Sequence, residues 1–334
     1  MTRLKLFIAN ALLLTLLVGA CTAARGPGPA DPLPSWHEGA TRQTILSFVA
    51  DVSDPAHPDF VPAAERVAVF DNDGTLWSEK PTYFQLLFIF DRIRSMADAH
   101  PEWRSTQPFQ AVLENDMEGL AAAGTEGLVT LAMTAQADLT TDEFAAMVAD
   151  WTATAKHPVS GRPFTSMVFQ PMLELLDYLR ANGFSVYIVS GGGIDFMRPW
   201  VERVYGVPPE NVIGSSPELR YDMRGEEPVI MRERAMHFIN DKAGKPVGIQ
   251  RFIGRRPILA AGNSDGDYEM LEWTTAGDGP RLGLLIHHTD AAREWAYDRE
   301  SSEGRLDRAL DAAPGYGWLV VDMTRDWAVV FPPP

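Results

Sequence analysis

The chain has 334 residues, of which 46% are hydrophobic and 22% charged, and this ordinary globular composition excludes wholesale disorder. Its 45 acidic against 29 basic side chains argue against a nucleic-acid-binding surface, because such surfaces need clustered Lys and Arg. The single cysteine excludes an internal disulfide framework and a thiolate metal cage. We therefore expect a soluble, acidic enzyme that is long enough to bury a full core.

The cysteine lies at the end of an expected export signal. Residues 1–20 begin with basic residues, continue as an apolar run too short to span a bilayer comfortably, and end in small residues. The run Val18-Gly-Ala-Cys21 resembles a bacterial lipobox, which implies that Cys21 becomes the lipid-modified first residue; the alternative is a signal anchor with an incidental cysteine. We expect an exported protein whose membrane contact is this lipid anchor. Since Thr22 rather than Asp follows, the expected site is the periplasmic side of the outer membrane in a Gram-negative cell.

Residues 21–34 are too rich in Gly and Pro to hold a helix or strand, so they are predicted to form a tether. In the body that follows, short apolar runs alternate with helical patterns. Continuous apolar runs predict strands that helices cover on both faces, and therefore a doubly wound, mostly parallel α/β sheet. The predicted strands are 67–70, 186–189, 258–261, 284–286 and 319–321.

Residues 81–157 contain helical signals alone. Phe144, Met147, Val148 and Trp151 recur at helical spacing, and a capping box of Thr140 and Glu143 precedes them. A helical insertion after the first strand suggests a cap over the carboxyl edge of the sheet, where such folds place their sites. We assign 35–80 and 158–334 to the α/β core and 81–157 to the helical cap.

The first predicted strand ends directly in Asp71 and Asp73. Two carboxylates that leave a buried strand are costly unless something pairs with them, and a hard divalent cation such as Mg²⁺ is a natural partner. Gly74 permits a sharp exit from the strand. The alternative interpretation is an Asp-rich turn with solvated acids.

The later strand ends carry further polar groups. Ser190 precedes a glycine run that starts at Gly191, and a hydroxyl with unhindered N–H groups at a helix start can hold an anion. Before a helix expected to start at Pro246, Lys245 can reach a phosphate as a point charge, with Lys242 as the alternative. A flexible glycine turn and solvated lysines are the alternatives without function.

In chain order, these pieces resemble the four motifs of the haloacid dehalogenase-like hydrolase superfamily, over roughly residues 64 to 290. Asp71-Asn-Asp73-Gly-Thr-Leu is similar to the first motif, Ser190 to the second, Lys245 to the third, and Gly262-Asn-Ser-Asp-Gly-Asp267 to the fourth. The helical insertion resembles the cap of the phosphoserine-phosphatase-like branch. The resemblance implies a Rossmann-like core.

The resemblance also implies a Mg²⁺-dependent phosphomonoester hydrolase. Asp71 would form an aspartyl-phosphate, Asp73 would be the general acid and base, and Ser190, Gly191 and Lys245 would hold the phosphoryl group. Dehalogenases of the superfamily lack the second acid, so phosphate chemistry is favoured over carbon–halogen cleavage. A phosphotransferase or phosphomutase with the same intermediate remains an alternative, as does a non-catalytic binding lipoprotein.

The implied magnesium ligands are Asp71, Asp73, Asn263 and Asp267. Asn263 stands where family members usually carry Asp, and an amide oxygen can ligate Mg²⁺ without contributing charge. The nearby Asp265 is an extra acid that can compensate.

Glu79 is a candidate substrate contact. It lies where the chain enters the cap, close to the acid that pairs with the substrate amine in phosphoserine-specific members, and Lys80 beside it is a second candidate. The expected partner is a small-molecule phosphomonoester, and the sequence leaves the oligomeric state open.

Overall fold

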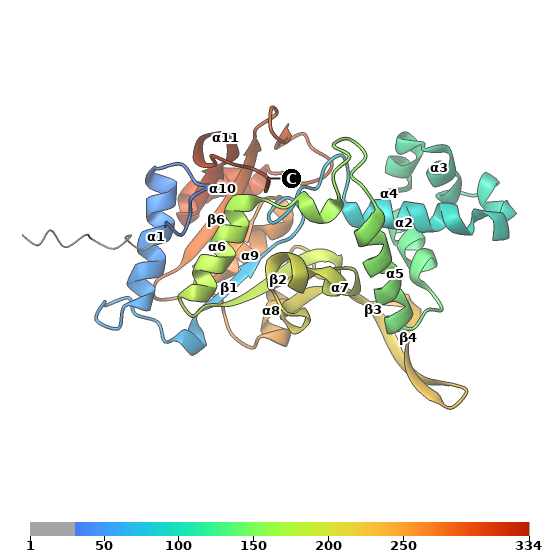
Figure 1. The fold of residues 1–334 in the computed structure, drawn as a ribbon, viewed down its shortest axis with the longest axis horizontal. Coiled ribbons are helices and arrows are strands. Elements are labelled where there is room, and N and C mark those ends of the chain that lie inside the picture. Colours follow the sequence, from blue (N-terminus) through green and yellow to red (C-terminus); the bar gives the residue numbers. More distant parts are fainter. Residues whose placement is uncertain (1–30, 334) are drawn as a thin grey trace, which may run out of the picture. The chain divides into compact units, whose positions relative to one another are not determined.

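The computed structural model describes residues 31–333, so the predicted signal peptide and Cys21 lie outside the described residues. A mostly parallel sheet forms the centre, with strand order β4-β3-β2-β1-β5-β6-β7 and with β8 paired to β6 (Figure 1). All five predicted strands are present and run parallel, as β1, β2, β5, β6 and β8. The strands are β1 (Val67–Phe70), β2 (Ser185–Gly193), β3 (Val212–Arg224), β4 (Glu227–Phe238), β5 (Leu259–Gly262), β6 (Leu282–Thr289), β7 (Ala296–Tyr297) and β8 (Leu319–Asp322).

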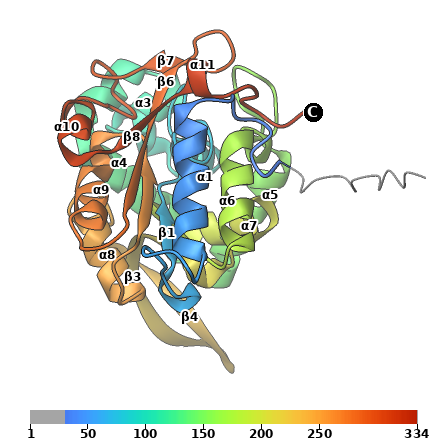
Figure 2. The ribbon, with the colours of Figure 1, turned by 90° about the vertical axis from the view of Figure 1, so that its left-hand side faces the viewer.

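Helices cover both faces of the sheet, which explains why its strands are apolar without alternation. In β1, Ala68 and Phe70 belong to one buried cluster, while Val67 and Val69 belong to a second on the opposite face. Figure 2 shows α1 and α6 on one side of the sheet and α8, α9 and α10 on the other. The core helices are α1 (Ala40–Ser53), α6 (Gln170–Ala181), α7 (Ile194–Tyr205), α8 (Gly244–Phe252), α9 (Tyr268–Thr275), α10 (Arg308–Tyr316) and α11 (Met323–Asp326).

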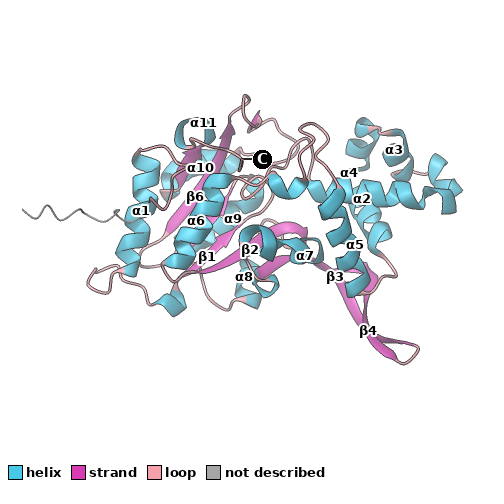
Figure 3. Cartoon of the chain, viewed as in Figure 1, coloured by secondary structure: helices cyan, strands magenta, loops and turns pink. Residues whose placement is uncertain are grey.

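The chain between β1 and β2 carries the predicted helices (Figure 3). The capping box at Thr140 and Glu143 is present, and Phe144 is fully buried against the ring of Phe88 at a centroid distance of 5.8 Å. These four helices, which we call the helical cap, are α2 (Phe84–Met96), α3 (Phe109–Glu114), α4 (Met117–Gln136) and α5 (Thr141–Thr154).

A long antiparallel hairpin of β3 and β4 extends the sheet and was not predicted. Its strands meet at a two-residue turn, where Gly225 has a φ of 66° that suits the first position of a type II′ turn. Leu219, Tyr221 and Met223 alternate with polar residues, which is the strand signal that the sequence analysis did not use. All three side chains are exposed, and Figure 1 shows the hairpin projecting past α5.

Within residues 31–333, no helix has both the length and the apolar character needed to cross a bilayer.

Candidate active site

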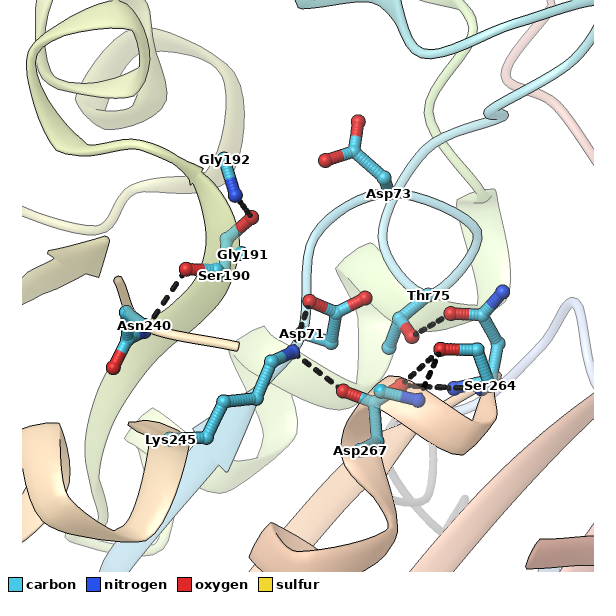
Figure 4. A network of polar contacts seen from close by, with 12 residues as sticks. Asp71, Asp73, Thr75, Ser190, Gly191, Gly192, Asn240, Lys245, Ser264 and Asp267 are labelled. Atoms are coloured by element: carbon cyan, nitrogen blue, oxygen red, sulfur yellow. Dashed lines mark hydrogen bonds and ion pairs between the residues drawn. The ribbon is translucent and has the colours of Figure 1, made fainter. Parts of the chain in front are cut away.

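The polar side chains predicted from the strand ends meet at one edge of the sheet (Figure 4). β1 pairs with β2 on one side and with β5 on the other, so Asp71, Ser190 and the segment after β5 are neighbours. Lys245 reaches the same edge from the first turn of α8. These groups border a cavity of about 370 Å³ whose remaining walls come from the helical cap and the base of the hairpin.

A buried ion triad lies at the floor of this cavity, where Asp71 and Lys245 border it and Asp267 lies behind them. The Nζ of Lys245 donates to Asp71 Oδ1 at 2.6 Å and to Asp267 Oδ1 at 2.5 Å. Burial and the charge of Asp267 raise the pKa of Asp71 well above its ordinary value. Burial lowers the pKa of Lys245, but Asp267 and Asp71 outweigh it and raise this pKa, which keeps the ammonium charged.

Both carboxylate oxygens of Asp267 are occupied. Its Oδ2 accepts from the backbone N–H groups of Asn263 and Ser264 at 3.0 and 3.1 Å, while Oδ1 is held by Lys245. Asp267 therefore fixes the lysine and the loop after β5. The metal ligation predicted for Asp267 from the sequence stays a prediction.

Asp73 lies on the other side of the loop after β1. Its Oδ1 accepts from Trp77 Nε1 at 2.8 Å, and the indole of Trp77 stacks on Trp200 at a centroid distance of 4.4 Å. The side chain keeps some surface open to the cavity, yet its enclosure raises the pKa of Asp73. A raised pKa favours the protonated form that a general acid needs.

Gly74 lets the loop turn back against the segment after β5. Its φ is 75°, and a Cβ there would lie 2.0 Å from Asn263 Nδ2. Any side chain at position 74 would therefore collide with the site.

Ser190 is buried, and its Oγ accepts from Gly192 N–H at 3.0 Å. The Gly193 N–H donates to Gln85 of α2 at 2.7 Å, so these two N–H groups are already paired. The carbonyl of Ser190 accepts from Asn240 Nδ2 at 2.9 Å. Gln85 and Asn240 were missed because no motif marks them, and their contacts span more than 40 residues of chain.

Asn263 and Glu79 form a second network beside the floor. Asn263 Nδ2 donates to Glu79 Oε1 at 2.8 Å, Tyr297 donates to the same oxygen at 2.8 Å, and Thr75 Oγ1 donates to Asn263 Oδ1 at 3.1 Å. Glu79 borders the cavity, but only 1% of it is exposed, and burial raises its pKa well above the ordinary value. The amide of Asn263 is thereby oriented, with its oxygen facing Thr75.

Three of the weaker candidates lie elsewhere. Asp265 does not compensate for Asn263, because its carboxylate caps α10 by accepting from the N–H groups of Asp307 at 3.1 Å and Ala309 at 2.9 Å. Lys242 is exposed, which leaves Lys245 as the lysine of the site. Lys80 donates to Ser301 Oγ at 2.6 Å and does not border the cavity.

The residues present fit a magnesium ion. Within residues 31–333, no group of three or more His, Cys, Asp or Glu side chains is arranged to hold a metal. At this site, Lys245 lies between Asp71 and Asp267, and the residue at position 263 is an amide instead of an acid. However, the buried acids Asp71, Asp267 and Glu79, with Asp73 nearby, outnumber the ammonium of Lys245. The carboxylate oxygens of Asp71 and Asp73 and the amide oxygen of Asn263 are hard donors that suit Mg²⁺, and a cation bound there would favour the ionised form of the carboxyl groups.

Comparison with known protein families matches residues 68–272 to the family described as haloacid dehalogenase-like hydrolase. A Bordetella pertussis Tohama I protein of unknown function is 17% identical over 78% of this chain and 99% of its own, with a TM-score of 0.50. An Anaerococcus prevotii protein, also of unknown function, is 17% identical over 74% and 85% of the two chains, with a TM-score of 0.49. A probable phosphoserine phosphatase from Vibrio cholerae is 14% identical over 78% and 68%, with a TM-score of 0.38. A search of curated proteins found no match.

Proposed function

This chain belongs to the haloacid dehalogenase-like hydrolase family, and we propose that it is a magnesium-dependent phosphomonoesterase acting through an aspartyl-phosphate on Asp71. The observation that carries the proposal is the buried Asp71–Lys245–Asp267 triad on the floor of a cavity that Asp73 and Ser190 also border. A nucleophile, an acid and a cation for phosphoryl oxygens therefore border one cavity.

The first chemical step is assigned to Asp71. A carboxylate oxygen of Asp71 attacks the phosphorus of the ester, the bond from phosphorus to the leaving oxygen breaks, and Asp73 gives that oxygen its proton. Asp73 then takes a proton from water, whose oxygen attacks the same phosphorus. The bond to Asp71 breaks, and inorganic phosphate and the free carboxylate result.

Other side chains hold and orient the reacting groups. Lys245 and the Ser190 hydroxyl are assigned to the phosphoryl oxygens, with the backbone at Gly191 beside them. Asp267 positions Lys245, and Asn240 positions Ser190. Mg²⁺ would be held by Asp71, Asp73 and the amide oxygen of Asn263. When bound, it would offset the repulsion between the carboxylates and an anionic ester.

A soluble form that starts at residue 21 tests the activity. We expect it to hydrolyse p-nitrophenyl phosphate with Mg²⁺, to lose this activity in EDTA, and to recover it when Mg²⁺ is restored. Full activity in EDTA would contradict the metal requirement. Alkyl phosphates formed in the presence of added alcohols, in place of inorganic phosphate, would show that the intermediate is passed to alcohols, as in a phosphotransferase.

The location is a separate proposal, supported by the run Val18-Gly-Ala-Cys21. The chain is exported, cleaved before Cys21 and anchored at the cell envelope through a lipid on that cysteine. Globomycin, which blocks lipoprotein signal cleavage, should cause uncleaved precursor to accumulate in a bacterial host. Normal processing in its presence would overturn this proposal.

A further inference from the structure

The cavity has two ends of opposite character. Its floor is polar and carries the triad, Asp73 and Ser190. Its outer wall is apolar and comes from three separate segments, two in the helical cap and one at the base of the hairpin. The outer-wall residues include Leu86 and Ile89 of α2, Leu128 and Met133 of α4, and Pro217 and Met236 of the hairpin.

An ion pair between Arg232 and Asp195 lies beside the outer wall. Arg232 of β4 donates to Asp195 and to Gln136, and its guanidinium lies 4.0 Å from the centroid of the Phe144 ring. Its remaining Nε is buried and has no hydrogen-bond partner among the described residues. Among the described residues that border the cavity, Lys245 and Arg232 are the cations, and Lys245 is held in the floor.

This arrangement disfavours an amino-acid leaving group. The carboxylate of phosphoserine would need a cation at the outer end, and the Arg232 guanidinium there already pairs with Asp195 and Gln136. An apolar group needs no such cation, and burying its surface against the outer wall is favourable. A cavity of about 370 Å³ also lies in the size range of sites for ligands much larger than serine.

We propose that the substrate is a phosphomonoester whose leaving group is apolar and uncharged, such as an alkyl or aryl alcohol. This inference rests on the proposed function and names the substrate class of the same site. The phosphate sits over the triad, and the alkyl or aryl body packs against the outer wall. A phosphoserine-like substrate, which the resemblance of the cap suggests, is the alternative that the following experiments distinguish.

A chain-length series tests the proposal. With the soluble form and Mg²⁺, kcat/KM should rise by about fourfold for each methylene from ethyl to hexyl phosphate, because each buried methylene is worth about 0.8 kcal/mol. Phosphoserine and glycerol phosphate should fall below butyl phosphate. A flat series, or a preference for phosphoserine, would overturn the proposal.

A matched pair of variants on α4 locates the effect. Met133 borders the cavity, whereas Met117 on the same helix is 56% exposed and does not border it. Met133→Gln should lower kcat/KM for hexyl phosphate by about tenfold more than kcat/KM for ethyl phosphate. Met117→Gln should leave both unchanged. Equal losses on both esters in Met133→Gln would contradict packing of the leaving group at this position.

Binding separates failure of this inference from failure of the proposed function. Calorimetry with hexylphosphonate and methylphosphonate, which cannot be hydrolysed, should give a clear preference for the hexyl compound. If no ester is hydrolysed, the proposed function fails, and this preference would still support the substrate class. If esters are hydrolysed but methylphosphonate binds as tightly as hexylphosphonate, the proposed substrate class is overturned and the proposed function is not.

Discussion

The floor and the outer wall of the cavity differ in how their side chains are held. In the floor, Asp71, Lys245 and Asp267 fix one another through short charged hydrogen bonds, and the loops around them are tied by further bonds. In the outer wall, residues such as Leu86 and Met133 are in place through packing alone. Under the proposed function and substrate class, the core holds the reacting groups, while the cap and hairpin select the leaving group. Changes in the floor should therefore affect all substrates alike, and changes in the wall should depend on the substrate.

Removing the nucleophile should have the largest effect. Asp71→Asn is expected to lower kcat by at least about a thousandfold for every ester, because an amide cannot form the aspartyl-phosphate. Steady-state kinetics on ethyl, hexyl and p-nitrophenyl phosphate measure this. Asp98→Asn is the control, since that side chain is fully exposed on the cap. A loss of kcat for one ester alone would contradict the expectation that changes in the floor affect all substrates alike.

The lysine of the triad should matter for both activity and stability. Lys245→Met leaves the buried Asp71 and Asp267 without their cation, so we expect a loss of about 3 kcal/mol in the free energy of unfolding and about a hundredfold in kcat. Urea denaturation in EDTA gives the first value. The exposed Lys242 is the matched control, and Lys242→Met should change neither. Equal effects of the two variants would contradict the assigned triad.

The network beside the floor predicts a coupling between two positions. Asn263→Asp replaces the amide N–H group that donates to Glu79 with a carboxylate oxygen that can only accept. We therefore expect the free energy of unfolding in EDTA to fall by about 2 kcal/mol. The double variant Glu79→Gln with Asn263→Asp restores a donor and should recover most of the loss. Urea denaturation of the wild type, both single variants and the double variant completes the cycle. Strictly additive changes would show that the two side chains do not interact.

The smallest effect is expected at Asp265, which caps α10 and lies outside both regions. Asp265→Ala should cost about 1 kcal/mol of unfolding free energy, as loss of a helix cap does, while kcat and the affinity for Mg²⁺ stay unchanged. Denaturation and magnesium calorimetry test this. Weaker magnesium binding in this variant would show that Asp265 contributes to the metal site.

The sequence was sufficient to predict the strands β1, β2, β5, β6 and β8 and much of the floor. Continuous apolar runs mark buried parallel strands, and the carboxyl ends of neighbouring parallel strands share one edge, which placed Asp71, Ser190 and the segment after β5 together. The hairpin was missed because continuous apolar runs mark only buried strands, whereas its strands are largely exposed and alternate apolar with polar residues. The contact of Asn263 with Glu79 depends on side chains 184 residues apart. Spacing alone also could not distinguish the role of Asp265 from that of Asp267. Asp265 caps α10, and this helix begins at Arg308, far along the chain.

The central claim is that a covalent phosphoryl group forms on Asp71. Rapid acid quenching during turnover of p-nitrophenyl phosphate, followed by mass spectrometry of the digested protein, tests it most directly. The account predicts a phosphoryl group on the peptide that contains Asp71, removed by hydroxylamine and absent from Asp71→Asn. Turnover with no phosphorylated peptide, or with the phosphoryl group on another residue, would contradict it.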